Sequence, residues 1–203
     1  MILTESGEIG VHVNDRVYVL RPSLYAMTQL GDPRAIVETY AEIMAYQHTP
    51  ALKWTQFKLA LSVLHVCGQD DLTDVFGYVN EQGKYVKKLA EFDDVVVLAQ
   101  SLMRHGVVGA QKPLPSSAER GQTYAEAFDA AEYVSSAIAH LGMTEREAWE
   151  STMTSLAGAF RAKFPPTESD APGAKAPTRE EHEATEAWFD EVDKRRKRRV
   201  AIH

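Results

Sequence analysis

The sequence predicts a mainly α-helical protein: a helical domain with a small N-terminal β-hairpin, then a linker and a C-terminal amphipathic helix. Apolar residues recur at the three- and four-residue spacing of helices through most of the chain, and capping residues precede several of these stretches. Valines alternate with other residues near the N-terminus, and a proline-rich stretch follows the last aromatic residue of the helical part. We therefore expect a body at residues 1–164, a linker at 165–177 and a terminal helix at 178–203.

The first predicted element is a β-hairpin. Residues Ile9–Val13 and Arg16–Leu20 carry valines at alternate positions, which is typical of strands with one buried face. Asn14 and Asp15 between them suit a two-residue turn. Because a two-stranded hairpin is only marginally stable alone, we expect one of its faces to lie on the helices that follow.

Helices then follow one another through the body. Ser23 stands at the start of the first, and Asp32 caps the second, which has proline at its first position. The stretch 51–67 is the most apolar and is expected to be central. A second small hairpin is expected at 78–86. The predicted helices of this part cover residues 22–31, 33–45, 51–67, 70–76, 91–105 and 124–141.

The stretch 141–156 predicts a further amphipathic helix with a well-defined start. Thr144 is a good N-cap, and Glu147 three residues later completes a capping box. The apolar stripe of this helix consists of Trp149, Met153, Leu156, Phe160 and Phe164. In most proteins such a face belongs to the core. The alternative interpretation is that Trp149 and Met153 contact a partner protein.

Residues 178–203 predict a second amphipathic helix. Thr178 and Glu181 form another capping box, and the helix ends in a basic run at 194–199. Its narrow apolar stripe lies beyond the proline-rich linker and therefore needs a partner. That partner is the protein's own body, a second copy of the chain or a client protein. The residues expected to bind it are Trp188, Phe189 and Val192.

Charge and cysteine content limit the functional classes. The chain of 203 residues has a net charge of −7, and because the segment 178–203 is neutral, residues 1–177 carry all of this excess negative charge. An acidic body disfavours general nucleic-acid binding, whereas the cations at 194–199 offer an alternative nucleic-acid contact. The single cysteine, Cys67, excludes an internal disulfide and fits a reducing cytosol. No apolar run approaches the roughly 18 residues that span a bilayer, and no signal peptide is visible.

No catalytic or cofactor-binding motif is visible, so we expect a protein that is not an enzyme and that uses no cofactor or metal. His182 and Glu183 begin like a zinc-protease motif, but Glu186 stands where that motif needs its second histidine. The paired acids at 70–71 and 93–94 lie at predicted helix starts, where capping explains them.

Three stretches resemble the small tail assembly chaperones of long-tailed, siphovirus-like bacteriophages. The central stretch is a Leu-Gly-x-Thr-x-x-x-Ala-Trp helix entry that leads to Thr-Met-Thr. Its matching residues are Leu141, Gly142, Thr144, Ala148, Trp149, Thr152, Met153 and Thr154. The second joins residues 5–10 to residues 18–27, where a short strand pair precedes an Arg-Pro-Ser helix start. The third is the Gly-Ala-Lys-Ala-Pro-Thr entry at 173–178 into the terminal helix.

The resemblance implies a protein that chaperones phage tail assembly. Such proteins bind the long, largely helical tape measure protein and the tail tube subunits in the host cytoplasm, and they are not expected in the mature virion. One alternative is a structural tail-completion or connector subunit of the virion. A second alternative is a nucleic-acid-binding regulator that uses the basic C-terminus. No membrane partner is expected, and homo-oligomerisation is kept as an alternative.

Overall fold

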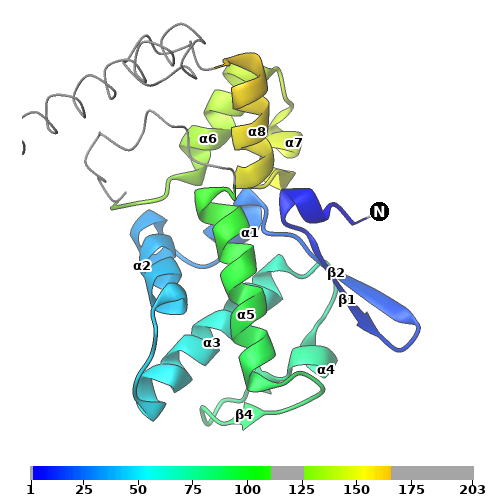
Figure 1. The fold of residues 1–203 in the computed structure, drawn as a ribbon, viewed down its shortest axis with the longest axis vertical. Helices are drawn as coiled ribbons and strands as arrows, with labels where there is room; N and C mark the ends of the chain where they lie inside the picture. The colour runs from blue at the N-terminus through cyan, green and yellow to red at the C-terminus, as the bar shows by residue number, and fades with distance from the viewer. Residues whose placement is uncertain (1, 111–125, 166–203) are drawn as a thin grey trace, which may run out of the picture. The chain divides into compact units, whose positions relative to one another are not determined.

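The computed structural model describes residues 2–110 and 126–165, which lie in one of the chain's two compact units. These residues are mostly helical, with short antiparallel strand pairs, so the predicted mainly α fold with an N-terminal β-hairpin is confirmed (Figure 1). Apart from Pro165, the predicted linker and the predicted terminal helix lie outside the described residues. Their boundaries therefore stay predictions.

The N-terminal hairpin consists of β1 (Ile9–Val13) and β2 (Arg16–Leu20), which pair residue for residue as predicted. Asn14 in the turn has a φ of 51°, a left-handed conformation that asparagine tolerates better than most residues. At the other end of the hairpin, Leu20 is fully buried and forms an isolated β-bridge with Gly68. This bridge attaches the hairpin to the end of a long helix, as expected for a strand pair too small to be stable alone.

A short helix, α1 (Leu24–Thr28), follows the hairpin and begins after Ser23, as predicted. The hydroxyl of Ser23 caps it by accepting a hydrogen bond from the amide of Ala26 at 3.1 Å. Leu24 and Met27 are fully buried. One face of α1 therefore belongs to the core, where it contacts helices from both halves of the described chain.

The long helix is α3 (Pro50–Cys67), which packs against α5 (Phe92–Met103) and α2 (Pro33–Met44). The predicted cap of α2 is confirmed, because a carboxylate oxygen of Asp32 accepts a hydrogen bond from the amide of Ala35 at 2.8 Å. The fully buried residues of α3 and α5 are Phe57, Ala60, Val63, Leu64, Val95, Ala99, Leu102 and Met103. The most apolar stretch of the sequence is thus central in the core, as predicted.

The predicted helix at 70–76 is shorter in the structure, where α4 covers Thr73–Phe76. The carboxylate of Asp71 accepts a hydrogen bond from the amide of Thr73 at 2.8 Å. Hydrogen bonds from Thr73 also lower the pKa of Asp71 below its ordinary value. Asp71 thus bonds the first amide of α4, but the predicted capping role is wrong in detail, because the N-cap position is Leu72 and has no side-chain cap.

The second hairpin, β3 (Tyr78–Val79) with β4 (Tyr85–Val86), is present where it was predicted. Gly83 lies in its turn with a φ of 76°, a conformation that favours glycine. The hydroxyl of Tyr85 donates a hydrogen bond to the carbonyl oxygen of Phe76 at 2.7 Å, which ties this hairpin to α4.

The helix predicted over 124–141 begins later, as α6 (Ala130–Ser136), and continues as the wider turns of η4 (Ala137–Leu141). The predicted start is wrong because the preceding residues are held by a neighbouring helix. The amide of Phe128 donates a hydrogen bond to the carbonyl oxygen of Pro33 at 2.8 Å, and the Phe128 side chain is buried. This contact is tertiary, so local propensity does not reveal it.

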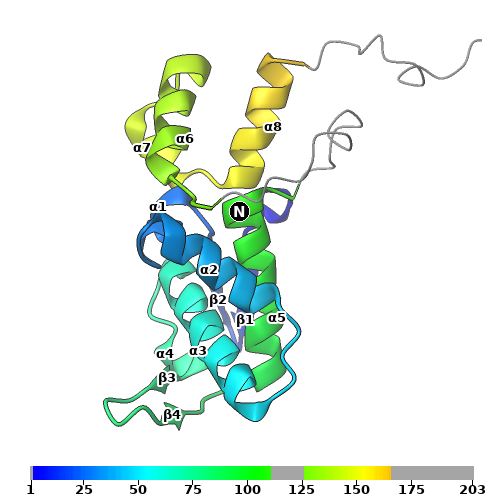
Figure 2. The ribbon, with the colours of Figure 1, turned by 90° about the vertical axis from the view of Figure 1, so that its left-hand side faces the viewer.

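The helix predicted over 91–105 continues past its expected end as the wider turns of η2 (Arg104–Val108). The single helix predicted from the stretch 141–156 is also wrong, because two helices occupy it: α7 (Glu145–Glu150) and α8 (Met153–Lys163). The two run in different directions (Figure 2). In both views α6, α7 and α8 lie together at one end of the described unit. The predicted apolar stripe is therefore divided between two helices.

Candidate protein-binding groove

The break between α7 and α8 positions the candidate site. The hydroxyl of Thr152 accepts a hydrogen bond from the amide of Ser155 at 3.2 Å, which caps α8, and donates one to the carbonyl oxygen of Ser6 at 2.7 Å. The residue before the cap is also held, since the amide of Leu24 donates to the carbonyl oxygen of Ser151 at 2.9 Å. Contacts with the N-terminal part of the chain therefore decide where α8 starts.

The other end of α7 is fixed locally. Gly142 ends η4 in a left-handed conformation with a φ of 71°, as its position in the sequence predicts. The predicted capping box is confirmed: the amide of Glu147 donates to the Thr144 hydroxyl at 3.3 Å, and the Thr144 amide donates to the Glu147 carboxylate at 2.9 Å. The hydrogen bonds that the Thr144 amide and hydroxyl donate to the carboxylate lower the pKa of Glu147. With both ends defined, α7 returns alongside α6 and brings α8 back to the same end of the unit (Figure 2).

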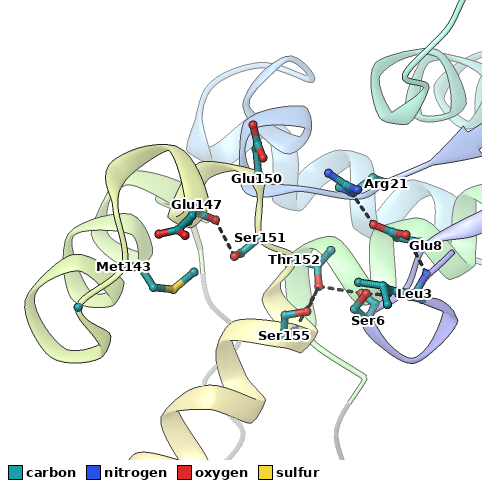
Figure 3. Close-up of a pocket in the computed structure, with 11 residues that line it drawn as sticks. Leu3, Ser6, Glu8, Arg21, Met143, Glu147, Glu150, Ser151, Thr152 and Ser155 are labelled. Carbon is teal, nitrogen blue, oxygen red and sulfur yellow. Dashed lines mark hydrogen bonds and ion pairs between the residues drawn. The ribbon is translucent and has the colours of Figure 1, made fainter. Parts of the chain in front are cut away.

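A polar cavity of about 470 Å³ lies beside the break, between the N-terminal residues and α7 (Figure 3). Its most buried charge is the side chain of Glu8, which is 3% exposed. One carboxylate oxygen of Glu8 accepts a hydrogen bond from Nε of Arg21 at 2.6 Å, and the other accepts one from the amide of Leu3 at 2.8 Å. Among the described side chains, no buried nitrogen or oxygen is without a hydrogen-bond partner. Hydrogen bonds at the cavity hold Glu8 to Leu3 and Arg21, and they hold Ser6 to Thr152 at the start of α8.

A second depression, an apolar groove of about 470 Å³, lies between α8 and the segment α6–η4. The groove is lined by Tyr133, Ser136, His140, Met153, Leu156, Ala157, Phe160 and Phe164. Met153 and Leu156 are 7% and 1% exposed and form its floor. Phe164 and Tyr133, by contrast, are 54% and 37% exposed. The groove therefore presents aromatic side chains to solvent at its edges, which is the character of a protein-binding surface.

The two helical segments that form the groove run in the same direction (Figure 2). Near their C-terminal ends the ring of His140 packs edge-on against the ring of Phe164, with 5.9 Å between centroids. Near the start of α6, Tyr133 stacks on Phe128 with 5.4 Å between centroids. Because Phe128 is itself buried, this stack holds the edge of the groove in place.

Charged side chains of opposite sign stand at the two ends of the groove. The basic residues Arg161 and Lys163 belong to the last turn of α8. The acidic residue Glu132 belongs to the first turn of α6, and Asp129 caps that helix. Since the two helices are parallel, these basic and acidic turns lie at opposite ends of the groove, next to its lining residues.

The start of α8 rests on a histidine of η2. Nδ1 of His105 lies 2.9 Å from the hydroxyl oxygen of Thr154, which also accepts a hydrogen bond from the amide of Ala110 at 3.0 Å. Burial, with a further contribution from the charge of Arg104, lowers the pKa of His105 and so favours its neutral ring. Gly7, with a φ of 95°, leaves the space that this ring fills, because a Cβ at that position would collide with His105.

One of the predicted partner-binding residues lies in the groove. Met153 lines the floor of the groove, where it is almost fully buried. Trp149 is on α7, is half-buried against the core and does not line the groove. The break at Thr152 thus separates two residues that the predicted stripe placed side by side. The predicted contacts that lie outside the described residues are Trp188, Phe189, Val192 and the basic run 194–199.

The opposite side of the groove is not visible in the sequence. Tyr133, Ser136 and His140 share one face of α6–η4, but they do not form an apolar stripe, so periodicity gives no signal for them. Phe160 and Phe164 were visible in the stripe of the following helix. What the sequence did not provide was the pairing of these two faces.

A reactive thiol and a metal site have less support in the described residues than a protein-binding groove. Cys67 is buried, and burial raises the pKa of its thiol, so the reactive thiolate is disfavoured. Within residues 2–110 and 126–165, no group of three or more histidine, cysteine, aspartate or glutamate side chains could hold a metal ion. Across the same two ranges, no helix is long and apolar enough to cross a membrane.

A family model matches residues 43–184, which is more than half of the chain. The chain belongs to the DUF6246 family, a family of unknown function. No curated protein and no solved structure matches it. All the residues that line the groove of this DUF6246 protein lie within the matched range. Ser6 and Leu24, which hold the α7–α8 break, lie before the matched range.

Proposed function

We propose that this DUF6246 protein is a phage tail assembly chaperone that binds the tape measure protein, the tail tube subunits or both during tail morphogenesis. It acts by binding a client and not by catalysis, and it needs no cofactor. It works in the host cytoplasm and is released before the virion is complete. The groove between α6–η4 and α8 is its contact surface for the client.

The observation that carries this proposal is the open apolar groove. A chaperone needs apolar surface that is accessible when the client is absent, and the exposed rings of Tyr133 and Phe164 provide it. A helix of the client can fill such a groove with one apolar face. The stretch that resembles the phage chaperones, Leu141 to Thr154, connects the two sides of the groove, which supports assigning the client to this site.

The proposal is tested by co-expressing the chain with the tape measure protein of the same genome and purifying the chain by an affinity tag. We expect the tape measure protein to be soluble only in the presence of the chain and to co-purify with it. A tape measure protein that is equally soluble alone, with no complex recovered, would contradict the proposal. Purified virions should lack the chain, whereas a structural tail subunit would be found in them.

Substitutions in the groove locate the contact. Tyr133→Ala combined with Phe164→Ala should lower recovery of the client about ten-fold, because large aromatic residues carry most of the binding energy at such interfaces. The matched control is Leu89→Ala with Val97→Ala, which removes two exposed apolar side chains outside the groove. The control should recover the client as the wild type does.

The terminal helix predicted at 178–203 has a separate test. Trp188→Ala combined with Val192→Ala should leave the described unit folded and weaken capture of the client. Circular dichroism checks the fold, and the same co-purification measures capture. Unchanged capture would remove this segment from the mechanism while leaving the groove in place.

A further inference from the structure

The groove is long enough to take the side-chain ridge of one additional helix. Along α8 its lining residues run from Met153 to Phe164, a length of about 16 Å at the helical rise of about 1.5 Å per residue. That length corresponds to about three turns of a bound helix. Between the aromatic edges the lining includes the small side chains of Ser136 and Ala157, which leave room for the apolar ridge of a partner helix.

The electrostatics of the groove distinguish its two ends. Because α6–η4 and α8 are parallel, both place their C-terminal carbonyl groups at the end near His140 and Phe164. Helix C-termini carry a partial negative charge, which favours the positive N-terminus of an antiparallel neighbour. At this same end Arg161 and Lys163 supply full positive charges. The opposite end carries the acids Asp129 and Glu132.

For a helix with acidic residues in its first turn, both effects favour the antiparallel orientation. An antiparallel helix places its own N-terminus beside Arg161 and Lys163, where acidic side chains in its first turn would form ion pairs. Its last turn lies beside Asp129 and Glu132, where basic side chains are favoured. Acids in the first turn and bases in the last turn also stabilise the partner helix through its own dipole. A parallel helix would oppose the dipoles of both neighbours.

We infer that the groove binds a single amphipathic helix of a partner protein, antiparallel to α6 and α8, with acidic residues in its first turn and basic residues in its last. The assignment of that helix to the tape measure protein rests on the proposed function, whereas the occupancy and polarity of the groove do not. Recognition combines a non-specific apolar face with a charge pattern that sets direction. This combination admits many helices of one charge polarity and discriminates against the reverse.

The test uses the full chain and two designed fluorescent peptides, each about 18 residues long and hence about 27 Å when helical. Both peptides share one leucine-rich face and the same composition. One has glutamates in the first turn and lysines in the last, and the other has these charges exchanged. Fluorescence anisotropy at low salt should show about five-fold tighter binding of the first peptide, with the preference shrinking as salt is added.

Variants of the chain assign that preference to the groove. Arg161→Glu combined with Lys163→Glu should abolish or reverse it. The matched control is Lys53→Glu with Lys58→Glu, which makes the same change in net charge on the exposed side of α3. The control should keep the preference. Circular dichroism and urea denaturation show whether each variant is folded, and Ala157→Trp, which fills the groove, should prevent binding of both peptides.

Several results would overturn the inference. Equal affinity for the two peptides, a preference unchanged by Arg161→Glu with Lys163→Glu, or no binding of either peptide would each do so. A dimer that dissociates in Phe164→Ala, with no peptide bound, would show instead that a second copy of the chain covers the groove. Peptide preference without capture of the tape measure protein would refute the proposed function alone. Capture without peptide preference would refute this inference alone.

Discussion

The described unit contains two pairs of packed helices that treat their apolar residues differently. In the α3–α5 pair, Phe57 is fully buried and stacks on Phe92 with 4.2 Å between ring centroids. In the pair formed by α6–η4 and α8, Phe164 is 54% exposed and has only the edge contact with His140 as its described ring contact. Each pair includes a helix whose apolar stripe is visible in the sequence, α3 in the first and α8 in the second.

Other elements account for this difference. The ring of Tyr85 in the second hairpin packs edge-on against Phe57 with 4.8 Å between centroids, and Trp54 stacks on the same ring at 5.7 Å. The α3–α5 contact is therefore closed by a third element. Among the described residues, the groove between α6–η4 and α8 has no such cover at its aromatic edges. A pair of packed helices is therefore buried or left open according to whether a third element covers it.

The largest effect on stability is expected from a substitution in the covered α3–α5 pair. Phe57→Ala should lower the free energy of unfolding by about 4 kcal/mol, because it removes a fully buried ring and leaves a cavity. Urea denaturation measures the change. Leu52→Ala on the same helix, where the side chain is 45% exposed, should cost less than about 1 kcal/mol. Similar losses in the two variants would mean that Phe57 is no more buried than Leu52 in solution.

The second largest effect on stability is expected at the break between α7 and α8. Thr152→Ala removes both the cap of α8 and the hydrogen bond to Ser6, so we expect a loss of about 2 kcal/mol in the free energy of unfolding. Thr49→Ala removes a cap from α3 with no such tertiary bond, and it should cost about 1 kcal/mol. A loss at Thr152 no larger than that at Thr49 would show that the contact with Ser6 contributes nothing.

His105, beneath the start of α8, predicts that the stability of the folded chain depends on pH. Because the pKa of His105 is lowered in the folded chain, the unfolded chain binds a proton at higher pH than the folded chain does. This contribution to stability is complete above the unfolded pKa of about 6.5 and is lost progressively as the pH falls below it, towards the folded pKa. The urea concentration at the midpoint of unfolding should therefore decrease as the pH falls from about 7.5 to about 5.5. The corresponding loss in the free energy of unfolding should be smaller than the loss caused by Thr152→Ala.

Two histidine substitutions isolate that dependence. His105→Gln should flatten the decrease, since the residue no longer titrates. His12→Gln, in an exposed position of β1, should leave the decrease as in the wild type. If both variants keep the full pH dependence, the decrease arises elsewhere in the chain.

The smallest effect on stability is expected at the edge of the groove. Phe164→Ala should lower the free energy of unfolding by less than about 1 kcal/mol, because the ring is already more than half exposed. The same urea titration used for Phe57→Ala gives the direct comparison of two phenylalanines. A loss as large as that of Phe57→Ala would mean that the groove is closed in solution and that Phe164 belongs to a core.

The sequence was most informative where the structural signals are local. The caps at Ser23, Asp32 and Thr144 act on amides two or three residues away, so their pattern alone placed three helix starts. Errors occurred where distant contacts override local preference, at Phe128 before α6 and at Thr152 before α8. The candidate site was predicted only in part, because its floor residue Met153 lies in a periodic stripe and its other side does not.

By itself the sequence determined the mainly α fold, the N-terminal hairpin and the identity of the central helix, because side-chain periodicity and capping are properties of neighbouring residues. Tertiary structure alone decided that the stripe from Trp149 to Phe164 divides, since a carbonyl of Ser6 and an amide of Leu24 fix the break. It also decided that Phe164 meets His140 across an open groove. Burial depends on which elements meet in space, and a one-dimensional pattern does not encode that directly.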